Sequence, residues 1–242
     1  MLDISLLTDK YNPKSYETDY QNGTPIPWIS FEDFLPQDYM LSVKKEVANI
    51  PEHLWTKFTR NGSLFYECNK LKYSPFTRQL IMAFNSSEFV TWLEQLTGLN
   101  KLIPDPHLIG AGLMKFGNQG CIKLHTDFNW NDQLNLNRAL SMILYLSDDW
   151  DESWGGSLEF WSLDRQNCLH KVEPKCNKLL LWNYDEQFLH GHSSQITCPP
   201  GKYRIGLRLF YFTSNATPIN PPHRSLYWYD DKIGYYDKRE YK

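Results

Sequence analysis

The residues best suited to chemistry form an ordered set: His125 and Asp127, two positions apart, then His190, and then Arg204. Residues two apart on a strand face the same side of a sheet, so His125 and Asp127 can aim at one point. Two imidazoles and one carboxylate can bind Fe(II) on one face and leave open positions for oxygen and an organic reductant. The set therefore predicts an iron centre for oxygen chemistry, with His125, Asp127 and His190 as the metal ligands and catalytic residues.

The third ligand has to come from a later strand, and three later histidines precede the C-terminal tail: His170, His190 and His192. The polar surroundings of His170 are typical of a solvated side chain in a hairpin. His190 follows two apolar residues and precedes Gly191, which lets the backbone turn close to a metal. We therefore expect His190 to be the ligand, and His192, on the same side of the strand, to support the ligands or face a substrate.

The charge of such a centre predicts a cation nearby. Iron with two neutral imidazoles and Asp127 carries one positive charge, and a bound 2-oxoglutarate dianion makes the set negative. A buried unpaired carboxylate costs roughly several kcal/mol, and an arginine can bind it bidentately. Arg204, at the start of a predicted strand, is the better candidate. Arg208 is the alternative, or else a surface or substrate-contacting residue, and the Tyr145 hydroxyl either binds the same carboxylate or packs in the core.

Composition favours one globular domain. The chain has 242 residues, of which 41% are hydrophobic and 22% charged, so a sizeable core is expected and disorder is not. Aromatic residues make up 15%, which is typical of a β-rich protein. The net charge of −3 does not favour nucleic-acid binding or an anionic membrane as partner. We therefore treat the whole chain, 1–242, as a single domain.

The cysteines and the N-terminus indicate a cytoplasmic protein. The five cysteines (68, 121, 168, 176 and 198) are odd in number and contain no C-x-x-C pair, so we expect reduced thiols. Cys168 and Cys176 flank a predicted hairpin, so they are the one pair that could form a disulfide across it. The first residues do not form a signal peptide, and no apolar stretch approaches the length of a membrane span.

Hydrophobic spacing predicts helices in the first part of the chain and strands afterwards. About 30 polar, turn-rich residues are expected to form an irregular lead-in with one short strand. Helical spacing, caps and breakers predict helices at 37–50, 75–84 and 87–97. Strands are expected at 108–116, 121–127, 138–147, 155–161, 178–184 and 203–213.

Helices followed by strands indicate the α+β class with an antiparallel core, closed as a double-sheet jelly roll. Residues 1–105 then form a helical support region that packs on one sheet, and 106–214 form the catalytic β core. Residues 215–242 form a C-terminal arm, which we expect to dock through its aromatic clusters at 227–229 and 235–236.

Between about 103 and 213 the sequence resembles the 2-oxoglutarate- and Fe(II)-dependent dioxygenases, specifically their prolyl 4-hydroxylase-like branch. The matching stretches are HTDFNW (125–130), ILYLSDDW (143–150), WGGSLEFW (154–161), FLHGH (188–192) and RIGLRLFYF (204–212). Ser147 replaces the usual asparagine of the second stretch. Five ordered matches are far more specific than any one of them.

The resemblance implies a double-stranded β-helix, Fe(II) at His125, Asp127 and His190, and 2-oxoglutarate held by Arg204 and Tyr145. It implies O₂ as oxidant, suggests ascorbate as a further cofactor, and predicts hydroxylation of a C–H bond with release of succinate and CO₂. A prolyl residue of a protein or peptide is the expected substrate. A free amino acid or another small metabolite is the alternative.

Several residues are expected to meet the substrate. Arg138 lies where relatives contact a substrate peptide, and we expect the pocket walls to include Trp130, Trp154, Trp161 and Phe210. A non-catalytic metal- or ligand-binding barrel is the alternative from a different class. The presence of all three ligands and the cation favours catalysis. On this basis, Asp127→Ala should abolish turnover and leave the fold intact.

Overall fold

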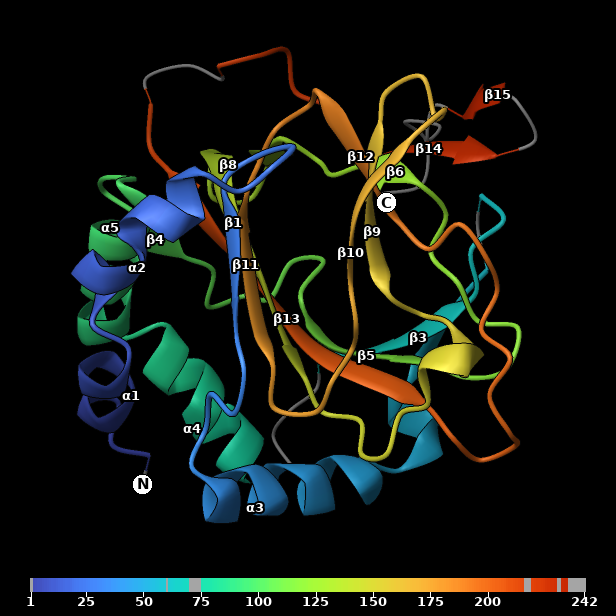
Figure 1. Cartoon of the computed structure of the whole chain (residues 1–242), viewed down its shortest axis with the longest axis horizontal. Helices are drawn as coiled ribbons and strands as arrows, with labels where there is room; N and C mark the ends of the chain where they lie inside the picture. The colour runs from blue at the N-terminus through green and yellow to red at the C-terminus, as the bar shows by residue number, and fades with distance from the viewer. Residues whose placement is uncertain (1, 60, 70–74, 216–218, 230–231, 235–242) are drawn as a thin grey trace.

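The computed structural model describes residues 2–59, 61–69, 75–215, 219–229 and 232–234 (Figure 1). Five α-helices lie in the N-terminal part of the described chain: α1 (Ser5–Lys10), α2 (Pro13–Gln21), α3 (Gln37–Ala48), α4 (Pro75–Phe84) and α5 (Ser87–Thr97). Short 3-10 helices occupy Glu52–Leu54 and Glu152–Trp154. The predictions of α3, α4 and α5 are confirmed. Within the described residues, no helix has the length and apolar character needed to cross a bilayer.

Two antiparallel sheets form the core, as the predicted double-stranded β-helix requires. In the described chain the larger sheet has the order β1-β11-β8-β13-β5-β3-β2, with β4 beside β13 and β7 beside β8. Its strands are β1 (Trp28–Phe31), β2 (Thr56–Phe58), β3 (Phe65–Cys68), β4 (Ile103–Pro104), β5 (Gly112–Phe116), β7 (Trp130–Asn131), β8 (Leu136–Tyr145), β11 (Leu179–Asn183) and β13 (Arg204–Thr213).

The smaller sheet carries His125 and His190, two of the three predicted metal ligands, and has the order β10-β9-β12-β6-β14-β15 among the described residues. Its strands are β6 (His125–Thr126), β9 (Leu158–Ser162), β10 (Cys168–Val172), β12 (Phe188–Gly191), β14 (Leu226–Tyr229) and β15 (Lys232–Gly234). Figure 1 shows β12, β6 and β14 side by side at the end of the molecule farthest from α1.

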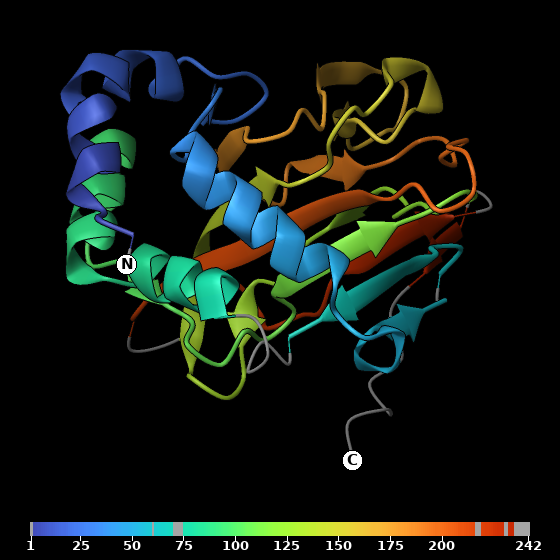
Figure 2. The ribbon, with the colours of Figure 1, turned by 90° about the horizontal axis from the view of Figure 1, so that it is seen from below.

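The helices cover the larger sheet, as expected from the sequence. Figures 1 and 2 show α1, α2, α4 and α5 along one side, with α3 crossing below the strands. One hydrophobic cluster joins buried residues of α4 and α5 to buried residues of β8, β11 and β13. Leu80, Phe89, Leu144 and Leu207 are all fully buried in it. This close-packed cluster makes the larger sheet rigid, and the larger sheet is the layer against which the smaller sheet is positioned.

The lead-in is helical, so the prediction of irregular structure there is wrong apart from the one short strand, β1. Asn12 accepts a hydrogen bond from the Lys14 N–H and Pro13 occupies the first turn, which is how α2 begins. The Tyr20 side chain is fully buried and its hydroxyl donates to Asn183 on β11. The Asn-Pro pair taken as a turn signal is therefore a helix start that is stabilised by distant packing.

The strand predicted at 121–127 is largely absent, because only His125 and Thr126 pair as β6. The residues before it bond to loops instead of to a ladder. Cys121 makes an isolated bridge with Leu64, and Ile122 accepts from the His192 N–H at 2.7 Å. These bonds fix the backbone of residues 121–122 without placing it in a sheet.

The C-terminal arm docks on the smaller sheet through β14, where Leu226 pairs with Thr126 and Tyr227 with His125. The second aromatic cluster, 235–236, lies outside the described residues. The five cysteines form no disulfide in the structure, and this includes the pair Cys168 and Cys176.

Candidate iron centre

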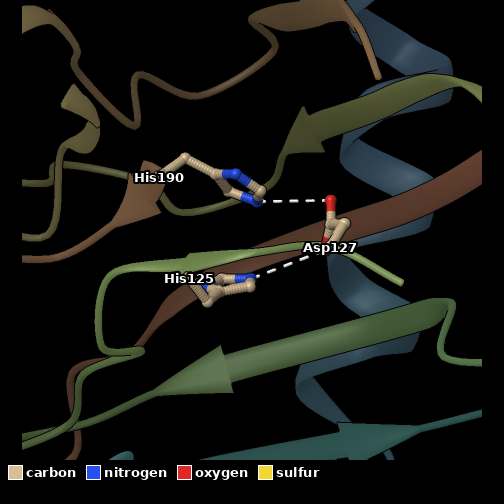
Figure 3. Close-up of side chains that lie close together, drawn as sticks. All are labelled: His125, Asp127 and His190. Carbon is tan, nitrogen blue, oxygen red and sulfur yellow. Dashed lines mark ion pairs between the residues drawn. The ribbon is translucent and has the colours of Figure 1, made fainter. Parts of the chain in front are cut away.

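His125, Asp127 and His190 meet although 65 residues separate the first from the last. Strands β6 and β12 are neighbours, and their register places His190 directly opposite His125. One ligand atom from each of the three residues lies within 4.8 Å of the others. Figure 3 shows both imidazoles pointing at the carboxylate, with His125 Nε2 at 3.5 Å and His190 Nε2 at 3.3 Å from its oxygens. The structure thus creates the convergence that the spacing predicted.

The His125 ring is held in one orientation from two sides. Its Nδ1 donates to the Lys123 carbonyl at 2.8 Å, since a carbonyl oxygen can only accept. Its face stacks on Tyr227 with centroids 4.7 Å apart and an interplanar angle of 17°. A proton on Nδ1 leaves the Nε2 lone pair free and directed toward Asp127, which is the arrangement a metal-binding histidine needs.

Asp127 is a buried carboxylate that remains ionised. Burial raises the pKa of its carboxyl group, but the positive charge of Arg138 opposes burial, and the pKa lies well below its usual value. The Arg138 Nη2 donates to Asp127 Oδ2 at 2.8 Å. A permanently charged oxygen ligand therefore faces the two imidazoles.

His190 completes the set as a neutral imidazole. Burial lowers its pKa to about 4, against the opposing effect of Asp127. Its ring centroid lies 4.3 Å from that of His125, and its Nδ1 has no hydrogen-bond partner among the described residues. Neutral imidazoles are the form in which histidine binds a divalent ion. This donor set fits Fe(II) with open positions.

Arg138 lies behind the ligands. Its side chain is fully buried, and its Nη2 also donates to Ser141 Oγ at 3.0 Å. The guanidinium carbon stands 3.5 Å from the ring centroid of Phe210 and 4.6 Å from that of Phe128. We therefore propose that Arg138 positions Asp127, in place of the substrate contact expected from the sequence.

Arg204 enters an inner cavity that also contains the three ligands. It is 3% exposed, and its Nη2 donates to the Tyr145 hydroxyl at 3.3 Å. No carboxylate pairs with Arg204 in the described part of the chain, and its Nε has no partner there. A buried cation that donates to a neutral hydroxyl and has no carboxylate beside it among the described residues is typical of an anion site. Arg208, by contrast, forms an ion pair of 2.8 Å with Glu67, so Arg204 is the better anion-binding candidate.

His192 also lines the inner cavity. Its side chain is 2% exposed and lies 4.9 Å from Phe116, measured between ring centroids. Burial first, and Arg204 second, hold the pKa of His192 well below its usual value. His170 takes no part in the site, because it stacks on Trp28 at 4.2 Å in β10.

A second, outer groove also reaches His125 and Asp127. It shares these two residues and Arg208 with the inner cavity, and its walls include Phe128, Trp130 and Phe210. Two of the aromatic walls expected from the sequence, Trp130 and Phe210, are therefore in place. The other two are not among its lining residues: Trp154 packs edge-on against Trp150, and Trp161 donates to Glu159.

Sequence reasoning missed the residues that support the ligands. Tyr227 stacks on His125 from the C-terminal arm, and the Tyr184 hydroxyl oxygen lies 3.4 Å from the Asp127 carbonyl oxygen. Glu186 accepts from Tyr184 at 3.0 Å and pairs with His223 at 3.1 Å, which ties the arm to the site. The aromatic cluster at 227–229 was the one available signal, and it indicated docking without indicating a partner.

Comparison with known proteins agrees with this site. Residues 111–212 match the family model of the 2OG-Fe(II) oxygenase superfamily. No curated protein matches the chain significantly in sequence. The matched residues include the three ligands and Arg204.

Similar solved structures share the fold at low sequence identity. A prolyl hydroxylase from Trichoplax adhaerens, in complex with a hypoxia inducible factor oxygen degradation domain peptide fragment, has 17% identity and a TM-score of 0.60, covering 88% of this chain and 94% of that chain. A prolyl-4-hydroxylase from Pseudomonas putida has 18% identity and a TM-score of 0.54, with 84% and 99% covered. A prolyl 4-hydroxylase from Phytophthora capsici has 18% identity and a TM-score of 0.64, with 90% and 68% covered.

Proposed function

We propose that this chain, whose residues 111–212 belong to the 2OG-Fe(II) oxygenase superfamily, hydroxylates a prolyl residue of a protein or peptide. As a 2-oxoglutarate-dependent dioxygenase it requires Fe(II), 2-oxoglutarate and O₂. His125, Asp127 and His190 would hold the metal, and Arg204 with Tyr145 would hold the co-substrate. When bound, the iron would allow O₂ to act as the oxidant: two electrons would come from 2-oxoglutarate, which leaves as succinate and CO₂, and two from the C–H bond that is hydroxylated.

The observation that carries the co-substrate assignment is the buried charge of Arg204. Without an anion, this buried guanidinium donates to the neutral Tyr145 hydroxyl and pairs with no carboxylate of the described residues. A carboxylate at the same place satisfies both donors at once. The three ligands open onto the same cavity, so a short dicarboxylate can reach from the metal to Arg204.

The outer groove supports a peptide as the substrate. Its aromatic walls (Phe58, Phe65, Phe128, Trp130, Phe210 and Tyr227) provide apolar faces of the kind that pack against a proline ring. The groove and the inner cavity share His125, Asp127 and Arg208. A side chain bound in the groove would therefore lie beside two of the residues that would hold the metal.

The test is an assay of purified protein with Fe(II), O₂ and 2-oxoglutarate, with and without proline-containing peptides and ascorbate. Succinate release, together with a peptide product heavier by one oxygen atom on proline, is the expected result. Succinate coupled to oxygenation of a free amino acid would replace the peptide by a small substrate. No succinate from metal-loaded protein with any of these compounds would favour the non-catalytic barrel.

Arg138→Met should destabilise the metal-free protein, because it leaves the Asp127 carboxylate buried without its counter-charge. Breaking such a pair costs about 3–5 kcal/mol, which is a fall in Tm of roughly 6–20 °C for a chain of this size. Bound metal supplies a new counter-charge, so the gap in Tm from the parent should narrow in Mn(II). Thermal unfolding with chelator and with Mn(II) checks this, and an equal gap in both would contradict the proposed role.

A further inference from the structure

His192 lines the inner cavity, but it is neither one of the proposed metal ligands nor one of the two residues proposed to bind the co-substrate. Its ring is almost completely buried, yet neither Nδ1 nor Nε2 has a hydrogen-bond partner among the described residues. A buried polar group without a partner costs about 1–3 kcal/mol. Buried polar groups in native proteins nearly always have partners, so this imidazole points to a ligand that supplies one.

The backbone around His192 is built to fix the position of its ring. Gly191 has a φ of 153°, and a Cβ there would lie 2.6 Å from the Ile122 carbonyl oxygen and 2.8 Å from that of Lys123. The His192 N–H then donates to the Ile122 carbonyl at 2.7 Å. Because a glycine permits this close approach and a hydrogen bond secures it, His192 enters the cavity from a rigid position.

His192 and Arg204 both lie against the ring of Phe116. Its ring centroid lies 4.9 Å from the His192 ring centroid and 5.1 Å from the guanidinium carbon of Arg204. Both side chains therefore border the same aromatic ring and the same cavity. An anion bound by Arg204 would come within reach of a ring N–H of His192.

We propose that His192 donates a hydrogen bond to the carboxylate of 2-oxoglutarate that Arg204 binds, and so helps to select a dicarboxylate co-substrate. This inference rests on the proposed function and adds a third donor beside Arg204 and Tyr145. A neutral imidazole carries one N–H, so it strengthens anion binding without adding a second buried cation. His192 thereby contacts the co-substrate and leaves the metal to the other two histidines.

The test measures equilibrium binding, without turnover, to the full chain loaded with Mn(II). We expect His192→Phe, which keeps a ring against Phe116, to weaken 2-oxoglutarate binding about 10- to 100-fold, as for a lost hydrogen bond to a charged group. Oxalate, which can chelate the metal but has no distal carboxylate, should bind parent and variant alike. His192→Asn and His192→Gln place an amide N–H near the positions of Nδ1 and Nε2, so one of them should recover most of the lost affinity.

Other results would overturn either the role of His192 alone or the proposed function as well. Equal 2-oxoglutarate affinity in His192→Phe, an equal loss for oxalate, or no recovery in either amide variant overturns the role of His192 alone. A parent protein that binds Mn(II) but not 2-oxoglutarate overturns the proposed function as well. Thermal unfolding serves as the folding control: Tm should not fall in His192→Phe, because the substitution removes two unpaired buried nitrogens. If that variant fails to fold, the two amide variants are compared with His192→Leu.

Discussion

Replacing Asp127 with asparagine should reduce 2-oxoglutarate decarboxylation more than about 100-fold, since even changes to the outer partners of a metal ligand cost 10- to 100-fold. The amide keeps the shape of the side chain but removes the negative charge that faces both imidazoles. Metal affinity and succinate release should therefore fall together. Isothermal titration with Mn(II) and a succinate assay measure the two losses.

Loss of Asp127 also breaks its buried ion pair with Arg138, so we expect a second effect, on stability, which the sequence alone did not indicate. From the sequence, Asp127→Ala was expected to leave the fold intact. The structure contradicts that expectation on physical grounds, because loss of the carboxylate leaves the Arg138 guanidinium buried without its partner. The cost is about 3–5 kcal/mol.

A double variant, Asp127→Asn with Arg138→Met, separates the two effects. It removes both charges, so we expect stability near that of the parent but no recovery of turnover. If the double variant regained decarboxylation at the parent rate, Asp127 would not be a metal ligand. If it stayed as unstable as Asp127→Asn alone, the destabilisation would not come from the unpaired guanidinium.

Replacing Arg204 with methionine should weaken 2-oxoglutarate binding by about 30-fold or more, because losing one partner of a buried charge pair costs 2–5 kcal/mol or more in binding. The thermal stability of the ligand-free protein, by contrast, should not fall in this variant. In the absence of co-substrate the guanidinium is buried and donates to the neutral Tyr145 hydroxyl. The ligand-free variant should therefore unfold at the same temperature as the parent or higher.

Two control variants define the role of Arg204. Arg204→Lys keeps the charge but loses the two-pronged geometry, so its affinity for 2-oxoglutarate should be intermediate. Arg208→Met tests the alternative arginine and should change co-substrate affinity much less, since Arg208 is already paired with Glu67. A larger loss in Arg208→Met than in Arg204→Met would reverse the assignment.

Much of the fold was predictable where local signals and long-range packing agree. Helix α5 begins at the Ser86 cap and ends at Gly98 in the left-handed conformation, both visible as residue types. The spacing of His125 and Asp127 predicted that the two side chains would face one point, and the structure brings them together although β6 ends at Thr126. Helix α2 was missed because Asn12-Pro13 is compatible with a turn or a helix start, and the buried packing of Tyr20 stabilises the helix.

The supporting contacts of the site were not predictable, because they join residues far apart in the chain. Nothing local in the sequence places Tyr227 on the face of His125, or links Glu186 to His223. The sequence predicted a functional role for Arg138, but the direction in which its side chain points depends on the packing of Phe210 against its guanidinium. Pattern therefore predicts which residues face the barrel interior, and the packed structure determines which of them meet.

The most direct measurement is the anomalous diffraction of iron in a crystal loaded with Fe(II) and 2-oxoglutarate without oxygen. We predict one iron peak per chain, within roughly 2.0–2.3 Å of His125 Nε2, His190 Nε2 and an Asp127 oxygen. The co-substrate should extend from that peak to Arg204. An iron peak held by other side chains, in protein that still converts 2-oxoglutarate to succinate, would contradict the account.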